Sequence, residues 1–151
     1  MTNEAGIRQE KLKNIFSGDN FSKYCGMEVL EAAPGYSKIR MKISDDHLNF
    51  FGTVHGGAIF ALGDSALGAA ANAYGTLSVA VSCNIQYMKS GVSGYLTAEA
   101  EEISLNHSLA TYLIHIYDDD EDEVATFQGM VYRKKKDILD MLEKENHPTT
   151  V

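Results

Sequence analysis

The chain has 151 residues, of which 44% are hydrophobic and 23% are charged, as in an ordinary soluble globular protein. This length favours one domain with a core large enough to fold without disulfide or metal crosslinks. The formal net charge of −8 argues against a general nucleic-acid-binding protein, which needs a basic face to neutralise phosphates.

Cysteine usage and the termini narrow the class of protein further. Cys25 and Cys83 are too few for a disulfide framework or a zinc site, so no metal site is expected. The N-terminal stretch MTNEAGIRQEKLKNIF lacks the uninterrupted apolar run of a signal peptide. The low-charge stretch 47–88 contains His, Asn, Ser and several Gly, which argues against a membrane span. We therefore expect a cytoplasmic protein with no membrane or nucleic-acid partner.

The first third of the chain predicts one helix and two strands. Residues 5–17 carry apolar side chains at a loose helical period among charges. In residues 36–43 apolar side chains alternate with Lys and Arg, which is typical of a half-buried strand. Residues 26–33 are its expected antiparallel partner across a turn at Pro34 and Gly35.

Residues 49–75, NFFGTVHGGAIFALGDSALGAAANAYG, predict a long helix that begins after Gly57 and ends at Gly75. Gly63 and Gly68 lie inside this helix, and each costs about 1 kcal/mol relative to alanine. A helix tolerates this cost where something must pack closely against its backbone. A helix that is apolar all round is a buried one, so we expect it to form the core.

The remaining chain is predicted to be extended. Four strands are expected, over residues 78–89, 95–105, 109–117 and 124–133. The short turns SGVSG, NHS and DDDEDE between them predict an antiparallel meander. A terminal helix over 135–145 and frayed last residues should follow. The predicted fold is α+β, with a long central helix wrapped by an antiparallel sheet of five to six strands.

Asp64 is the only Asp, Glu, Lys or Arg residue between Asp46 and Lys89. Its position in mid-helix excludes a capping role. Solvent exposure is unexpected because its neighbours one turn away are apolar or small, namely Phe60, Ala61, Leu67 and Gly68. A structural ion pair with a distant cation remains an alternative. A buried carboxylate is costly unless it is partnered or used, so Asp64 is a candidate catalytic residue.

The start of the helix is a candidate site for a developing oxyanion. Its N–H groups lack intrahelical partners and carry a positive dipole, and Gly56 and Gly57 let a substrate approach the backbone. Gly57 and Asp64 are seven residues apart, or about 10 Å along a helix. A reacting carbonyl needs both groups within about 3 Å, which one helix cannot provide. Two copies related by a two-fold axis can, so we predict a site shared across a homodimer.

A motif that spans this region resembles the hotdog-fold thioesterases, and more narrowly their phenylacetate-degradation (PaaI-like) branch. Its pattern N-x-x-G-x-x-H-G-G-x-x-x-x-L-x-D is formed by Asn49, Gly52, His55, Gly56, Gly57, Leu62 and Asp64. The resemblance covers roughly residues 25–134, which predicts a hotdog domain there. Residues 1–24 would form an N-terminal helical segment and 135–151 a C-terminal helix and tail. The acid nine residues after the histidine makes the match more specific than a bare HGG.

The resemblance implies an acyl-CoA thioesterase that acts on an aryl or medium-chain acyl group. Asp64 would be the general base for water or the nucleophile, and the Gly57 N–H would stabilise the oxyanion. Asn49 would orient the water or the substrate carbonyl. His55, which alone is more often structural than catalytic, would hold the loop and touch the thioester. No cofactor is implied, because coenzyme A is part of the substrate, and a homodimer or dimer of dimers is expected.

Further substrate and coenzyme A contacts are expected around these positions. Tyr87, Lys89 and Ser90 match the segment that contacts coenzyme A in the family, and Lys89 suits a phosphate. Gly56 and Ser65 adjoin the catalytic positions and are expected to contact the substrate.

The chain departs from the family pattern at one position. Family members often carry a hydroxyl residue four positions before the Asn of the N-I-x-Y pattern, which is Asn84 here. That position is Ala80. Ser82, expected as a substrate contact, or Ser78 would have to replace the hydroxyl.

Other functions are weaker alternatives. GDSAL at 63–67 resembles the GDSL hydrolase block with Ser65 as nucleophile, but that block belongs in a strand-to-helix turn rather than in mid-helix. A hotdog acyl-thioester hydratase or dehydratase, and a non-catalytic acyl-CoA sensor, remain alternatives on the same fold. The spacing of His55 and Asp64 favours the thioesterase.

Overall fold

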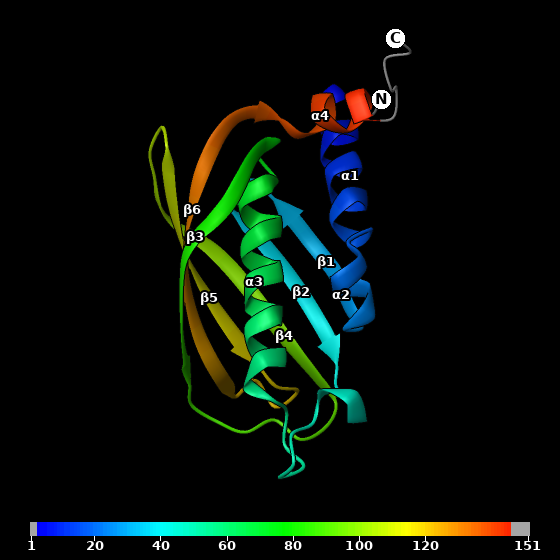
Figure 1. Cartoon of the computed structure of the whole chain (residues 1–151), viewed down its shortest axis with the longest axis vertical. Helices are drawn as coiled ribbons and strands as arrows, with labels where there is room; N and C mark the ends of the chain where they lie inside the picture. The colour runs from blue at the N-terminus through cyan, green and yellow to red at the C-terminus, as the bar shows by residue number, and fades with distance from the viewer. Residues whose placement is uncertain (1–2, 146–151) are drawn as a thin grey trace.

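The computed structural model of the chain describes residues 3–145 (Figure 1). Its elements are α1 (Glu4–Ser17), α2 (Asn20–Tyr24), β1 (Met27–Ala33), β2 (Tyr36–Lys42), a short 3-10 turn (Asp45–His47), α3 (Gly56–Asn72), β3 (Thr76–Tyr87), β4 (Tyr95–Leu105), β5 (Leu109–Tyr117), β6 (Glu123–Asp137) and α4 (Ile138–Glu145). The predicted helices and strands are therefore confirmed, apart from shifts at their ends. The last residues, predicted to fray, lie outside the described range.

Helix α2 lies within the predicted N-terminal helical segment, but the sequence pattern did not identify it as a separate α-helix. It has five residues, too few to show a helical period. Its start is fixed by Asp19, whose side chain accepts the N–H of Ser22 at 2.8 Å. This is an ordinary N-cap.

The six strands form one antiparallel sheet in the order β1-β2-β4-β5-β6-β3, which curves around α3 (Figure 1). This is the predicted α+β arrangement of a long helix wrapped by a sheet. β1 and β3 lie at the two edges of the sheet, and every strand between them pairs on both sides.

The predicted four-strand meander is wrong in one respect. β4, β5 and β6 do follow one another, but β3 pairs with β6 at the far edge, and β4 pairs with β2. The segment 88–94 is a crossing rather than a hairpin. Its Gly91 carbonyl accepts the N–H of Val54 at 2.8 Å, so the segment runs past the loop that leads into α3. A short connection therefore joins two strands that are not neighbours.

The sheet covers one face of α3 closely. Leu62, Ala66 and Leu67 are almost fully buried against it. A Cβ added to Gly63 would lie 2.8 Å from Cδ2 of Phe127 in β6, so close packing requires this glycine, as predicted. The core of the molecule lies at this contact. For Gly68 the same prediction is wrong, because an added Cβ would meet nothing within 4 Å.

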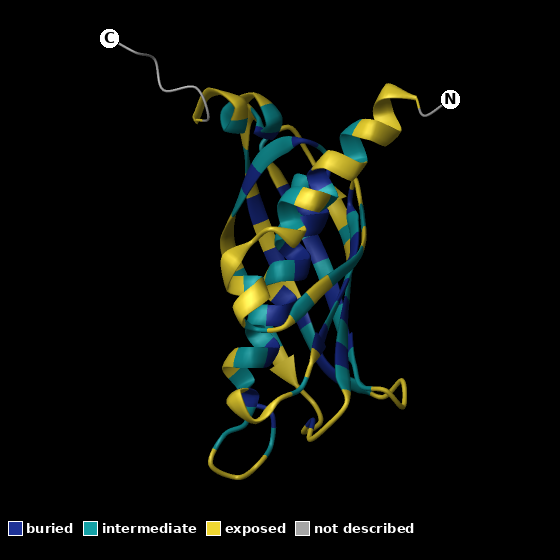
Figure 2. Cartoon of the chain, turned by 90° about the vertical axis from the view of Figure 1, so that its right-hand side faces the viewer, coloured by how far each residue is buried: buried dark blue, intermediate teal, exposed yellow. Residues whose placement is uncertain are grey.

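The opposite face of α3 is not covered by the sheet, and the expectation that Asp64 is buried within an all-round apolar environment is wrong. Asp64 and Gly57 are exposed, and Gly68 and Asn72 are half-buried. Figure 2 shows that buried stretches lie toward the middle of the molecule, whereas the N-terminal helix and the loops at the ends of the sheet are largely exposed. A curved sheet has a single concave face and can bury only one side of a helix. The apolar character of the other side comes from Ala and Gly, which expose little surface.

The two ends of the described chain meet beside the C-terminal end of α3 (Figure 1). Gln9 of α1 donates to the Ala73 carbonyl at 3.0 Å, and Arg8 pairs with Asp137 at the end of β6. The N–H of Ile138 donates to the Gly75 carbonyl at 2.9 Å. No helix among residues 3–145 is both long and apolar enough to cross a membrane.

Two glycine-to-alanine substitutions in α3 should have opposite effects on stability. Gly68→Ala should raise the free energy of unfolding by up to about 1 kcal/mol, because alanine favours the helix and its Cβ meets nothing within 4 Å. Gly63→Ala should lower it by about 1–3 kcal/mol, because its Cβ clashes with the Phe127 ring. Urea unfolding of both variants measures the change in the free energy of unfolding. Changes of the same sign in the two variants would contradict the close packing of Gly63 against Phe127.

Candidate active site

The start of α3 is fixed by His55, which has an extended backbone and caps the helix. Its Nδ1 accepts the N–H of Gly57 at 2.8 Å, and its carbonyl accepts the N–H of Ala58 at 2.9 Å. Because Nδ1 is an acceptor, neutral His55 carries its proton on Nε2. In the single chain, the N–H predicted to face a substrate oxyanion thus donates to an imidazole. A substrate oxygen must share this N–H with His55 or displace it.

Two further predicted residues hold the loops around this helix start. The Tyr87 hydroxyl at the end of β3 donates to the Gly56 carbonyl at 2.9 Å. Oδ1 of Asn49 accepts the N–H groups of Phe51 and Thr53 at 3.0 and 3.2 Å. Nδ2 of Asn49 donates to Oγ1 of Thr53 at 3.0 Å, which leaves one amide hydrogen available. Both side chains therefore have structural partners in the single chain.

Asp64 lies in the middle of α3 and makes no hydrogen bond or ion pair with any residue between 3 and 145. Its side chain reaches solvent through a cavity of about 440 Å³, called here the Asp64 cavity. The surrounding atoms still restrict its hydration, and this desolvation raises the pKa of Asp64 above its ordinary value. The adjacent Ser65 shares a hydrogen bond of 3.2 Å between its Oγ and that of Ser22 in α2.

The predicted site residues do not converge within one chain. Asp64 and Ser65 line the Asp64 cavity, whereas His55 and Gly57 line a second cavity of about 630 Å³ beside Cys25 and His47. The third cavity, of about 300 Å³, is lined by Asn49, Gly56, Tyr87, Lys89 and Ser90 among others. One chain thus separates the carboxylate from the helix N-terminus, as the helical rise requires.

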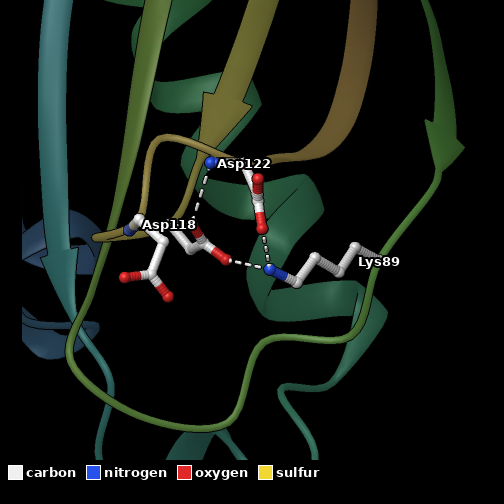
Figure 3. A network of polar contacts seen from close by, with 4 residues as sticks. Lys89, Asp118 and Asp122 are labelled. Carbon is white, nitrogen blue, oxygen red and sulfur yellow. Dashed lines mark hydrogen bonds and ion pairs between the residues drawn. The ribbon is translucent and has the colours of Figure 1, made fainter.

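Lys89 is held at the turn between β5 and β6 (Figure 3). Its Nζ donates to Oδ2 of Asp118 at 2.7 Å and to Oδ2 of Asp122 at 2.5 Å. These hydrogen bonds raise the pKa of Lys89, and the bond from Lys89 lowers the pKa of Asp118. A phosphate of coenzyme A would have to compete with two carboxylates for this ammonium group.

The register of β3 bears on the missing hydroxyl at position 80. Ala80 pairs with buried Val131, whereas Ser82 pairs with exposed Met130, because a bulge lies between Ala80 and Ser82. Paired residues point to the same side of a sheet, so Ser82 lies on the face away from α3 and Asp64. The hydroxyl of buried Ser78 donates to the Thr76 carbonyl at 3.2 Å. Neither serine replaces a hydroxyl at position 80.

Several residues near Asp64 were not predicted. Cys83 pairs with buried Gly129 across the sheet and therefore faces α3. Burial raises the pKa of the Cys83 thiol, and the negative charge of Asp64 raises it further. The bulge shifts the strand alternation that would have identified it. Phe16 and Ser22 reach the Asp64 cavity from the N-terminal helices. No local pattern predicts these contacts, because they join segments far apart in the chain.

Known proteins resemble the chain over most of its length. The profile of the thioesterase superfamily matches residues 51–125. An Archaeoglobus fulgidus protein named "Putative esterase" is 35% identical over 131 residues, which are 85% of each chain. The acyl-coenzyme A thioesterase PaaI of Escherichia coli is 29% identical over 79% of this chain and 86% of its own. The solved structure of E. coli PaaI matches with a TM-score of 0.83 at 26% identity, over 87% of this chain and 96% of that one.

Removing the charge of Asp64 should stabilise the protein at neutral pH. Because desolvation raises the pKa of Asp64 in the folded chain, the wild type loses stability as the pH rises through that pKa. Asp64→Asn should therefore raise the free energy of unfolding near pH 7, and the gain should vanish below about pH 4. Urea unfolding across this range tests it. Asp120→Asn, in an exposed turn, is the control; an equal gain in both variants would contradict the prediction.

Proposed function

Because this chain is a thioester hydrolase of the thioesterase superfamily, in its PaaI-like hotdog branch, we propose that it hydrolyses an acyl-CoA to a free acid and coenzyme A. The observation that carries the proposal is the unpaired Asp64 carboxylate at a cavity, with a pKa raised by desolvation. A carboxylate with a raised pKa is a better base, and no cation among residues 3–145 neutralises it. The name of the E. coli relative supports coenzyme A as the leaving group.

Asp64 acts as the general base in this reaction. It takes a proton from water as the water oxygen attacks the thioester carbonyl carbon, and the carbonyl oxygen becomes an oxyanion. When the tetrahedral intermediate collapses, the C–S bond breaks and the thiolate of coenzyme A takes the proton back from Asp64. Direct attack by Asp64, through an anhydride that water then hydrolyses, uses the same carboxylate.

The oxyanion is stabilised by the Gly57 N–H of a second copy. Two observations support this: Gly57 and Asp64 face different cavities in one chain, and β3 is an edge strand of the sheet. Its outer edge exposes large apolar side chains, with Val81 56% and Tyr87 51% exposed. Antiparallel pairing of two β3 edges sets the two α3 helices side by side in opposite directions. The helix start of each copy then faces the middle of the other.

His55 and the third cavity complete the proposed site. An oxyanion is a stronger acceptor than an imidazole, so the Gly57 N–H shifts from His55 Nδ1 to the oxyanion as charge develops. Coenzyme A lies along the cavity lined by Asn49, Tyr87 and Ser90. Lys89 exchanges an aspartate for a phosphate there when the substrate binds.

Asp64→Ala should lower kcat for acyl-CoA hydrolysis by at least about 10²-fold, because the base that activates water is lost. The Kd of the acyl-CoA should change little, because binding uses other contacts. Release of the coenzyme A thiol gives kcat, and calorimetry gives Kd. Glu10→Gln on the exposed side of α1 is the control and should keep full activity. An Asp64→Ala variant with the kcat of the wild type would contradict this mechanism.

Mixing two inactive variants tests whether the site is shared between copies. Asp64→Ala keeps Gly57, and Gly57→Pro keeps Asp64 but lacks the N–H of residue 57. A mixed dimer has one intact site, so random exchange of subunits should restore about one quarter of wild-type activity. Each variant alone should stay inactive after the same unfolding and refolding. If the mixture recovers nothing although mixed dimers are detected by mass spectrometry, both groups act within one chain.

A further inference from the structure

Gly68 occupies a position in α3 where no packing contact requires a glycine. A Cβ added there meets nothing within 4 Å, in contrast to Gly63, whose added Cβ would meet the Phe127 ring at 2.8 Å. Glycine weakens the interior of a helix, so an alanine would serve the fold better. Gly68 lies one turn after Asp64 on the same side of α3. The missing side chain therefore leaves space beside the candidate catalytic carboxylate.

That space is part of the Asp64 cavity, whose walls are mostly hydrocarbon. Its apolar walls include Phe16 of α1, Met27 and Val29 of β1, Ile39 of β2, Leu77 of β3 and Ile138 of α4. A volume of about 440 Å³ falls in the range of about 300–1,000 Å³ that small-molecule sites have. The cavity runs along α3 from Asp64 to Asn72, eight residues or about 12 Å.

The polar side chains of the wall that already have hydrogen-bond partners are those of Asp19, Ser22, Ser65 and Asn72, whereas Asp64 and Ser17 make no side-chain hydrogen bond among residues 3–145. Ser65 and Ser22 bond to each other. The side-chain amide of Asn72 donates to the carbonyls of Gly68 and Ser78 at 2.9 and 3.1 Å and accepts the Ser78 N–H at 2.8 Å. A ligand in this cavity gains little from carrying hydroxyl groups, because these side chains would have to give up existing hydrogen bonds. It gains from burying hydrocarbon.

We propose that the Asp64 cavity holds the acyl chain of the substrate, with the thioester carbonyl at Asp64 and the hydrocarbon over Gly68. This inference rests on the proposed function and names its substrate class: an unbranched hydrocarbon acyl group of intermediate length, in preference to acetyl or a hydroxylated aromatic acyl group. Gly68 provides the floor of the pocket. Phe16 on α1 lines the same cavity and limits the length of the chain.

The dependence of kcat/KM on the length of the acyl chain tests this assignment of the pocket. In the wild type, kcat/KM should rise from acetyl-CoA to octanoyl-CoA by up to about fourfold for each added methylene. Gly68→Leu fills the floor of the pocket and should lower the ratio of kcat/KM for octanoyl-CoA to kcat/KM for acetyl-CoA by at least about tenfold. For Gly68→Ala this ratio should lie between the values of the wild type and Gly68→Leu. Phe16→Ala removes an aromatic side chain from the cavity wall and should move the optimum of kcat/KM to longer acyl chains. Ratios that respond to neither position, or a wild-type preference for 4-hydroxybenzoyl-CoA, would overturn the pocket assignment.

A binding measurement separates failure of the pocket from failure of the proposed reaction. In the Asp64→Asn background, calorimetry should give a lower Kd for octanoyl-CoA than for acetyl-CoA, and adding Gly68→Leu should remove the difference. If the wild type releases thiol from no acyl-CoA, the proposed function fails while this comparison still decides whether the pocket binds acyl chains. Equal Kd values for the two ligands before the second substitution would overturn the pocket whether or not hydrolysis occurs.

Discussion

The close contact between α3 and the concave face of the sheet is the interaction on which the other features depend. Small residues make it possible from both sides: Gly63 leaves room for Phe127, and a Cβ on Gly129 of β6 would lie 2.4 Å from Cδ2 of Leu67. A helix packed this tightly has one face that is shielded from water by the sheet. The stripe of residues that carries Asp64 must therefore lie on the opposite face. The same packing that forms the core therefore presents the carboxylate to a cavity.

The beginning of the helix is fixed as firmly as its core face. His55 caps Gly57, and Tyr87 binds the carbonyl of Gly56, so the first turn of α3 is tied to its own loop and to the end of β3. A movement of the β3 edge would move the N–H groups at the helix start. A second copy that pairs with this edge would consequently meet a helix N-terminus whose position is already set.

Within residues 3–145 Asp64 is isolated from cations, so no ion pair opposes the effect of desolvation on its pKa. An ion pair would lower the pKa of a carboxylate and weaken it as a base, whereas desolvation alone raises the pKa. The ion pairs of Lys89 with Asp118 and Asp122, and of Arg8 with Asp137, do not include Asp64. A strongly acidic chain can thus keep a basic carboxylate in the middle of an apolar helix.

The sequence by itself determined the six strands and the long helix and singled out candidate residues for the site, because side-chain period, turn residues and helix spacing act over a few neighbouring residues. It also gave the separation of Gly57 and Asp64, which follows from the helical rise. Only the tertiary structure decided the position of β3 beside β6, the exposure of Asp64 and the direction of Ser82, which depends on one bulge. The cavity over Gly68 likewise required α1, β1 and α4 to meet α3. Contacts between distant segments leave no local pattern, since each segment would have the same sequence whichever neighbour it packed against.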